Sequence, residues 1–120
     1  MQIQRLDFVA VPSRDADTAR AFYVNTLGLR PDEHGRYEFW IGDTCCGIWE
    51  PERVGRDFEP QRNAHLALHV DEVETARSEL EARGVEFIGD ILDTGVCHMA
   101  FFRDPDGNDL MLHSRYKPYE

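Results

Sequence analysis

Three histidines are the residues whose types and spacing most directly suggest chemistry in this sequence. His65 and His69 lie in the segment His65–Val70, and His113 lies in the segment Leu110–Arg115. Both segments are predicted to be β-strands, in which every second side chain points to the same face, so His65 and His69 share one face. Imidazoles on such a face bind a divalent metal ion, act as a general base, or form ordinary hydrogen bonds. All three interpretations stay open at this point.

The three cysteines suggest less chemistry. Cys45 and Cys46 are adjacent and Cys97 stands alone, so the set is odd and contains no CxxC spacing. Neither a disulfide framework nor a zinc knuckle is expected, and the thiols are predicted to be reduced in a cytoplasmic protein. A redox or nucleophilic role for Cys45 and Cys46 is the alternative, but spacing identifies no basic group beside them. The sequence also lacks a Ser-His-Asp ordering, a glycine-rich phosphate loop and an HExxH helix.

The elements that must position these residues form two similar series. In the first, a strand over Ile3–Val11 stops at Pro12, and a helix follows that Ser13 or Asp15 caps and Gly28 ends. Short apolar runs between turn residues then predict three antiparallel strands. Their ranges are Leu29–Glu33, Tyr37–Ile41 and Thr44–Trp49.

The second series repeats this order after a charged stretch that is rich in proline and glycine. A strand over His65–Val70 precedes a helix over Asp71–Arg83, which Gly84 ends. The turn-rich segment Asp104–Asn108 joins the last two of three further strands, and it is too short for an EF-hand loop. These strands cover Val85–Leu92, Val96–Arg103 and Leu110–Arg115.

An internal comparison supports a duplication. A shift of 57 residues lays Asp15 on Glu72, the tripeptide Thr18–Arg20 on Thr75–Arg77, and Phe8 on His65. We therefore predict an α+β fold of two tandem βαβββ modules with mixed sheets. The chain, 1–120, is expected to be one domain, with module one over 1–50, a linker over 51–63 and module two over 64–120.

Composition limits the partners. Hydrophobic residues make up 42% of the chain and charged residues 30%, which is typical of a globular protein. The formal net charge of −10 repels phosphate backbones and anionic lipids, so neither nucleic acid nor membrane is expected as a partner. No apolar run approaches 18 residues and no secretion signal is visible. The acidic balance mildly favours a cationic ligand.

Two motifs carry a resemblance to a known family. The run Ala19–Tyr23 followed by Leu27–Leu29 is similar to the first-helix signature of the vicinal oxygen chelate superfamily, which includes glyoxalases, bleomycin-resistance proteins and extradiol dioxygenases. The segment Phe102–Asn108 resembles the turn of its second module. The resemblance implies helices on the outer face, a concave cup formed by the free faces of the two sheets, and a homodimer. A small organic molecule is expected in the cup, within one chain or across the dimer.

The resemblance also implies where a metal would bind. Metal-binding members use one residue on the first and one on the last strand of each module, usually His, Glu or Gln. The four positions fall here on Phe8, Gly47, His65 and Met111. Only His65 offers a suitable donor, so the usual divalent site is predicted to be lost. A slip of the register would bring Glu50 inward and give two ligands.

The expected ligand pocket combines aromatic, thioether and imidazole side chains, which suit a flat or apolar ligand. Its expected lining is Phe8, Trp49, His65, His69, Met111 and His113. Further residues lie on strands of uncertain facing, namely Tyr37, Phe39, Trp40, His98, Phe101 and Phe102.

Two functional hypotheses follow. The first is a binding protein without metal or cofactor, which sequesters an aromatic or cationic antibiotic or metabolite. The second is a glyoxalase-like lyase or isomerase, or a dioxygenase. It would use His65 as a general base, or a divalent metal such as Zn, Ni, Mn or Fe held by His65 with His69, His113 or Glu50.

Overall fold

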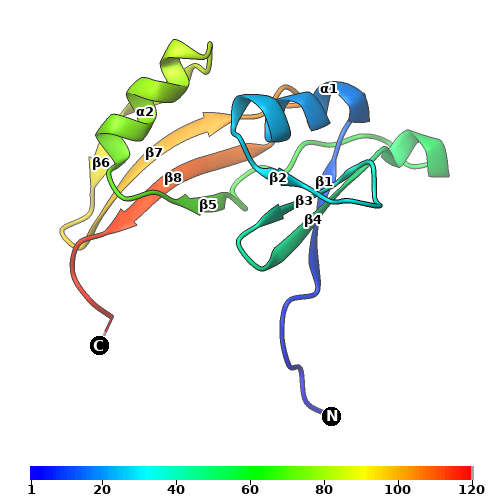
Figure 1. Ribbon diagram of the computed structural model, residues 1–120, viewed down its shortest axis with the longest axis horizontal. Coiled ribbons are helices and arrows are strands. Elements are labelled where there is room, and N and C mark those ends of the chain that lie inside the picture. The colour runs from blue at the N-terminus through cyan, green and yellow to red at the C-terminus, as the bar shows by residue number, and fades with distance from the viewer. Residues whose placement is uncertain (120) are drawn as a thin grey trace. The chain divides into compact units, whose positions relative to one another are not determined.

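The strand–helix–three-strand series predicted twice in the sequence is present twice in the computed structural model, which describes residues 1–119 (Figure 1). The chain divides after Pro60 into two compact units, here called unit 1 and unit 2. Each unit holds a four-stranded mixed sheet with the same strand order. The α+β fold of two repeated modules is thereby confirmed, whereas the concave cup and the ancestral duplication stay predictions.

Unit 1 pairs its first strand with its last. The order in its sheet is β1-β4-β3-β2, with β1 parallel to β4 and the other pairs antiparallel. Its elements are β1 (Phe8–Pro12), α1 (Ala16–Ala21), the π-helical turn η1 (Phe22–Thr26), β2 (Arg30–Pro31), β3 (Glu38–Ile41) and β4 (Thr44–Trp49).

The prediction of the first strand was wrong at its start. Pairing with β4 runs only from Phe8 opposite Cys45 to Pro12 opposite Trp49. Residues 1–7 have no strand partner, and backbone groups without a partner do not sustain a strand. Pro12, expected to lie just beyond the strand, is its last residue, as an edge strand permits.

The predicted first helix is confirmed, although it has two parts. The Asp15 carboxylate accepts a hydrogen bond from the Thr18 N–H at 3.2 Å, so Asp15 is the N-cap, while the Ser13 hydroxyl accepts from the Asp15 N–H. The helix then widens into η1, and Gly28 takes a left-handed conformation, with φ of 73°, that ends it.

The strand predicted over Leu29–Glu33 is reduced to Arg30–Pro31. Pro31 has no N–H to donate to a ladder, and Asp32 begins a turn directly after it. The strand therefore ends early, and the turn that replaces it shapes the cleft described below.

The core of unit 1 lies between its sheet and the helical segment. Tyr23 stacks on Phe39 with ring centroids 4.6 Å apart and an interplanar angle of 14°, and both side chains are buried. Val11, Cys46 and Ile48 are buried on the same face of the sheet. The opposite face of the sheet, here called the open face, is not covered by α1 or η1.

Unit 2 repeats this arrangement with the order β5-β8-β7-β6, and α2 lies along one face of its sheet (Figure 1). Leu110 and Leu112 are buried on the helix face, because side chains two apart on a strand share a face. The strand and helix bounds differ from the predicted ones by one to two residues at most ends. The elements are β5 (Leu66–His69), α2 (Val73–Ala82), β6 (Phe87–Asp93), β7 (Cys97–Arg103) and β8 (Asp109–Arg115).

The predicted linker contains a 3₁₀ turn, η2 (Pro51–Val54), and its end is attached to unit 2. The Gln61 N–H donates to the Asn108 side-chain oxygen, and the Asn63 N–H donates to the Asp109 carboxylate, both at 2.8 Å. Among residues 1–119, no helix is long and apolar enough to cross a membrane.

Candidate functional site

A cleft of about 490 Å³ occupies the open face of the unit 1 sheet. The strand register explains its shape. Phe8 and Ala10 of β1 are two residues apart and therefore point to the same face, and Ala10 pairs with Gly47 of β4. Trp49 lies two residues beyond Gly47 on the same face. The lining residues are Phe8, Ala10, Gly35, Arg36, Tyr37, Glu38, Gly47, Ile48 and Trp49.

The floor of this cleft is almost free of side chains. A Cβ added at Gly47 would meet only the Phe8 ring, 4.0 Å away, so the glycine leaves open space beside that ring. Ala10 contributes a single methyl group next to it. The floor therefore separates the Phe8 ring from the Trp49 ring and leaves room for a flat group.

The turn before β3 forms another wall. The Asp32 carboxylate accepts hydrogen bonds from the Gly35 N–H at 2.7 Å, the Trp40 indole at 2.9 Å and the His34 N–H at 3.0 Å. These bonds, the one from Gly35 foremost, lower the pKa of Asp32 to about 2. An ionised Asp32 thus fixes the turn that brings Arg36, Tyr37 and Glu38 to the cleft.

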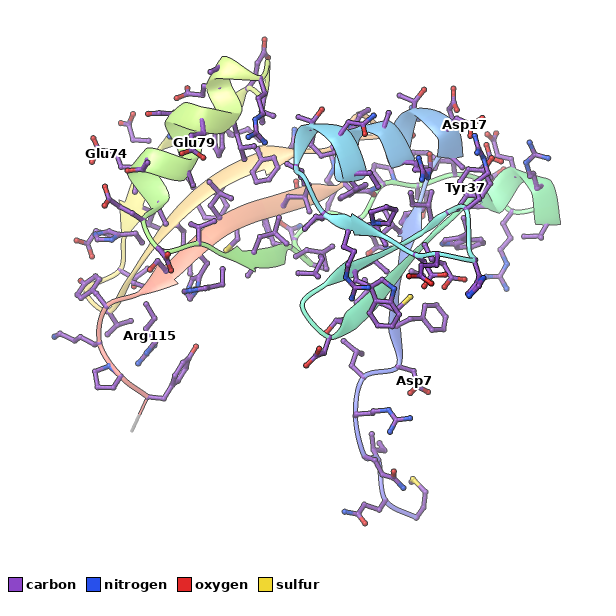
Figure 2. The ribbon with its side chains drawn as sticks, viewed as in Figure 1. Asp7, Asp17, Tyr37, Glu74, Glu79 and Arg115 are labelled. Atoms are coloured by element: carbon purple, nitrogen blue, oxygen red, sulfur yellow. The ribbon has the colours of Figure 1, made fainter. Side chains whose placement is uncertain are left out.

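The two charged side chains of the lining differ in their partners. Arg36 lies 3.1 Å from Asp17 on α1, and the Tyr37 hydroxyl donates to the same carboxylate at 2.9 Å (Figure 2). The bonds from Tyr37 and Arg36 lower the pKa of Asp17. Glu38 has no ion pair among the described residues, and its recorded side-chain bond is from the Cys45 thiol at 3.5 Å.

Cys45 and Cys46 do not offer a reactive thiolate. Burial, followed by the hydrogen bond to Glu38, raises the pKa of Cys45. Burial also raises the pKa of Cys46 to about 11. All three cysteines are free thiols in the structure, and nothing supports the redox or nucleophilic alternative considered for Cys45 and Cys46.

The open face of the unit 2 sheet carries the predicted histidines. Ala67 pairs with Met111 and His69 pairs with His113 across β5 and β8, so these side chains share a face. Phe101 of β7 pairs with Met111 and joins them. The structure therefore brings His69 beside His113, whereas Phe8 and Trp49 belong to the unit 1 cleft.

His65 has a different neighbour, Asp109. Its Nε2 lies 3.8 Å from the Asp109 carboxylate, its ring meets Phe101 edge-on at 5.4 Å, and its side chain is 24% exposed. Burial raises the pKa of Asp109, but hydrogen bonds from the Asn63 N–H and Arg103, together with the His65 charge, outweigh burial and lower it. An ionised carboxylate thus lies beside a partly accessible imidazole.

His98 is apart from the other strand histidines. It pairs with Ser114 in the sheet and lies on the helix side, 3.4 Å from Asp93, where it helps line a separate cavity of about 430 Å³. The uncertain facing of His98 is thereby resolved. His69, with a side chain 73% exposed, lies 3.9 Å from Asp71.

The residues present do not fit the divalent metal that the family resemblance implies. Gly47 and Met111 occupy equivalent places, since each pairs with an alanine of the first strand of its unit. Phe8 and Gly47 supply no donor and Met111 supplies only a thioether, which leaves His65 as the single suitable ligand. Within the described part of the chain, no three His, Cys, Asp or Glu side chains are grouped to hold a metal ion.

Glu50, which a slip of the register would have made a metal ligand in place of Gly47, contacts other groups. It follows the end of β4, and its carboxylate accepts the Ala16 N–H at 3.3 Å and pairs with Arg53. The side chain therefore serves the start of α1 rather than the open face.

Sequence reasoning missed two residues of these sites. Glu38 had a usable signal, since Phe39 beside it is apolar and alternation would have placed Glu38 on the opposite face. Asp109 had none, because its burial depends on the attachment of the segment around Asn63.

Comparisons with known proteins agree with this fold. Residues 5–112 match the family model described as Glyoxalase/Bleomycin resistance protein/Dioxygenase superfamily. A protein of Escherichia coli named "Uncharacterized protein YaeR" is 27% identical over 94% of this chain and 98% of its own length. A lactoylglutathione lyase of Schizosaccharomyces pombe is 35% identical over 71 residues, which are 57% of this chain but only 24% of that enzyme.

Among solved structures, a glyoxalase/bleomycin resistance protein/dioxygenase from Nocardioides aligns with a TM-score of 0.79 at 17% identity. The alignment covers 100% of this chain and 91% of that one, which shows a shared fold. Because the family model spans most of the sequence and the strand order repeats in both units, the chain belongs to the Glyoxalase/Bleomycin resistance protein/Dioxygenase superfamily.

Proposed function

We propose that this protein binds a small aromatic molecule in the unit 1 cleft, without a metal ion. The observation that carries the proposal is the floor of Ala10 and Gly47 between the Phe8 and Trp49 rings. A flat ring placed there would bury apolar area against both side chains, which is how aromatic ligands are usually held.

The side chains at the expected metal positions support the metal-independent part of the proposal. Metal-binding relatives are expected to carry ligands at two positions that are occupied here by the ring of Phe8 and by Gly47, which has no side chain. The same two replacements that remove donors create the cleft. Loss of the metal and gain of an aromatic binding surface would thus have one structural cause.

The name of the superfamily is compatible with this role. It covers bleomycin resistance proteins as well as glyoxalases and dioxygenases, so membership favours a small molecule as the ligand without deciding between binding and catalysis. The homodimer implied by the resemblance stays a prediction, which sedimentation of the purified protein would measure.

The test combines metal content with binding of a neutral aromatic probe, 1-methylnaphthalene, followed by the fluorescence of the probe and by thermal shift. Protein purified without chelator is expected to hold far less than one equivalent of any divalent metal, and the probe is expected to saturate. Trp49→Ala should weaken binding at least about tenfold, since a stacked aromatic contact is lost. Phe58→Ala is the matched control, because Phe58 packs under Arg14 outside the cleft.

Two results would contradict the proposal. Stoichiometric divalent metal in the purified protein would mean that the donor set has been misjudged. Equal losses in Trp49→Ala and Phe58→Ala would mean that the probe binds elsewhere.

A second candidate function, acid–base catalysis at His65, is favoured by one specific observation. The ionised, buried Asp109 lies 3.8 Å from the His65 imidazole, where its charge would stabilise the imidazolium that forms when His65 accepts a proton. The similarity to a lactoylglutathione lyase points in the same direction, although it covers a quarter of that enzyme.

S-lactoylglutathione formation from methylglyoxal and glutathione is the assay for this candidate. Turnover by the parent should fall at least about a hundredfold in His65→Ala, the usual contribution of a general base. His98→Ala, on the helix side of the same sheet, is the control and should keep the parent rate. A parent protein without turnover would remove the candidate for this substrate, and unchanged turnover in His65→Ala would remove the proposed base.

A further inference from the structure

The geometry points to Glu38 as the residue that makes the unit 1 cleft selective for an aromatic ligand with a positive charge, such as a quaternary or protonated ring nitrogen. This inference rests on the proposed function, because it names the class of ligand for the same cleft. It adds a residue that determines ligand specificity, and the proposal of binding without a metal ion does not depend on that residue.

Glu38 stands at a wall of the cleft, next to its floor. It pairs with Gly47 across β3 and β4, and Gly47 pairs in turn with Ala10, so these three residues form one row across the sheet. The Glu38 carboxylate lies 3.5 Å from the Cys45 thiol, and Cys45 pairs with Phe8, so the carboxylate borders the open space beside the Phe8 ring. A cation in that space would lie close to it.

Among residues 1–119, no Arg, Lys or His side chain forms an ion pair with the Glu38 carboxylate. Arg36, the lining residue of opposite charge, pairs with Asp17 on the outer side, and Asp17 also accepts the Tyr37 hydroxyl. The guanidinium charge is therefore balanced outside the lining. The Glu38 carboxylate is therefore available to a ligand, since its other bond, from the Cys45 thiol, is weak.

The turn holds the Glu38 side chain in place. A Cβ added at Gly35 would meet the Glu38 Cδ at 2.8 Å and its Oε1 at 2.9 Å, so the side chain lies tightly across the glycine. The Glu38 N–H donates to the Gly35 carbonyl at 3.1 Å, and Asp32 fixes the same turn. The side chain therefore lies over the turn, at the edge of the cleft.

The rings around the carboxylate act in the same direction. Phe8, Tyr37 and Trp49 line the cleft, and the faces of aromatic rings attract cations through their quadrupole. A neutral aromatic ligand gains the stacking contacts alone. An aromatic cation gains the stacking contacts, the ring faces and the carboxylate together.

The experiment compares two probes of the same size and shape, 1-methylquinolinium, which is a cation, and 1-methylnaphthalene, which is neutral. The parent protein is expected to bind the cation about tenfold more tightly than the neutral probe. Glu38→Gln keeps the shape of the side chain, and it should weaken the cation until both probes bind within about twofold of each other. Its affinity for the neutral probe should stay unchanged.

Glu33→Gln is the matched control. Glu33 lies on the same turn and is exposed, but it does not line the cleft, so the substitution changes the net charge equally without touching the site. This variant should keep the preference of the parent. Circular dichroism and thermal unfolding would show that both variants fold.

Each failure has a separate meaning. Equal binding of the two probes by the parent would overturn the cation inference and leave the proposed function intact. Equal effects of Glu38→Gln and Glu33→Gln would assign the preference to net charge and overturn the role of Glu38. If neither probe binds, both the proposed function and this inference are wrong. If the protein then also self-associates, and Trp49→Ala abolishes the self-association, the face that carries the cleft would be assigned to contact with a second copy of the chain.

Discussion

At the scale of single residues, the chemistry of this protein is decided by what replaces the expected ligands. Phe8 and Gly47 place a ring and a gap where metal ligands were expected, and His65 has a carboxylate, Asp109, as its neighbour. The proposed binding and the alternative acid–base chemistry both start from these positions. Asp32 shows how strongly one side chain can set the local geometry.

Asp32 predicts a specific pH dependence of stability. Its pKa is about 2 in the folded protein, below the usual 3.8, so its bonds stabilise the fold fully above about pH 4 and are lost as the pH falls towards 2. In Asp32→Asn this contribution is absent. The variant should therefore be less stable than the parent at pH 7, and the difference should shrink between pH 4 and pH 2.

Urea unfolding at several pH values measures this effect, with Asp43→Asn on an exposed turn as the control. Parallel pH profiles for the parent and Asp32→Asn would show that the carboxylate makes no such contribution.

At the scale of elements, the two helices occupy corresponding places but begin differently. Asp15 accepts the Thr18 N–H and caps α1, whereas Glu72 at the start of α2 makes no capping bond with the backbone and instead accepts the Thr75 hydroxyl. The two positions are related by the 57-residue shift, which makes them a natural pair for comparison.

The pair predicts unequal costs. Asp15→Ala should lower the free energy of unfolding by about 1 kcal/mol, the usual value of a lost N-cap bond. Glu72→Ala should lower it by only a few tenths of a kcal/mol, because an exposed side-chain pair contributes about that much. Chemical denaturation of both variants compares them directly, and equal losses would show that the Asp15 bond is not what stabilises α1.

At the scale of the whole molecule, the predicted linker over 51–63 is tied to the rest of unit 2 through its last residues. Gln61 and Asn63 donate to Asn108 and Asp109, and Asp109 donates back to the Gln61 carbonyl at 2.9 Å. Asn108 is buried and also donates to Asp104 at 2.7 Å. The turn before β8 therefore organises the connection as well as the sheet.

Removal of this tie should be visible as local opening. Asn108→Ala leaves the Gln61 N–H and the Asp104 carboxylate without this partner and should cost about 2 kcal/mol. Trypsin should then cut faster at Arg56 and Arg62, which lie in the released segment. Asp57→Ala in the exposed part of that segment is the control, and equal cleavage rates in the two variants would contradict the role of Asn108.

Net charge predicts a salt dependence for ligand binding. With a formal charge of −10, the protein attracts cations over distances that salt screens. The affinity for 1-methylquinolinium should therefore fall as sodium chloride rises from 20 mM to 500 mM, whereas the affinity for 1-methylnaphthalene should stay constant or rise slightly. Titrations at both salt concentrations measure this, and identical salt dependence of the two probes would contradict it.

The sequence by itself determined the order of the elements, most of their bounds, and the facing of the first and last strands of unit 2. Gly28 and Gly84 ended the helices because a left-handed residue stops a helix wherever it occurs. Alternation separated Leu110 and Leu112 from Met111 because the two faces of a strand are fixed by local geometry. The family resemblance added the positions at which a metal would be expected.

Only the tertiary structure decided features that depend on residues far apart in the chain. The first strand begins at Phe8 because its partner β4 begins at Thr44, which the amino-terminal segment cannot reveal. Glu38 meets Gly47 through strand register, and Asp109 is buried partly because residues 61–63 dock against it. Propensity and periodicity act over a few neighbours, whereas pairing and burial are set by whichever distant segment supplies the partner.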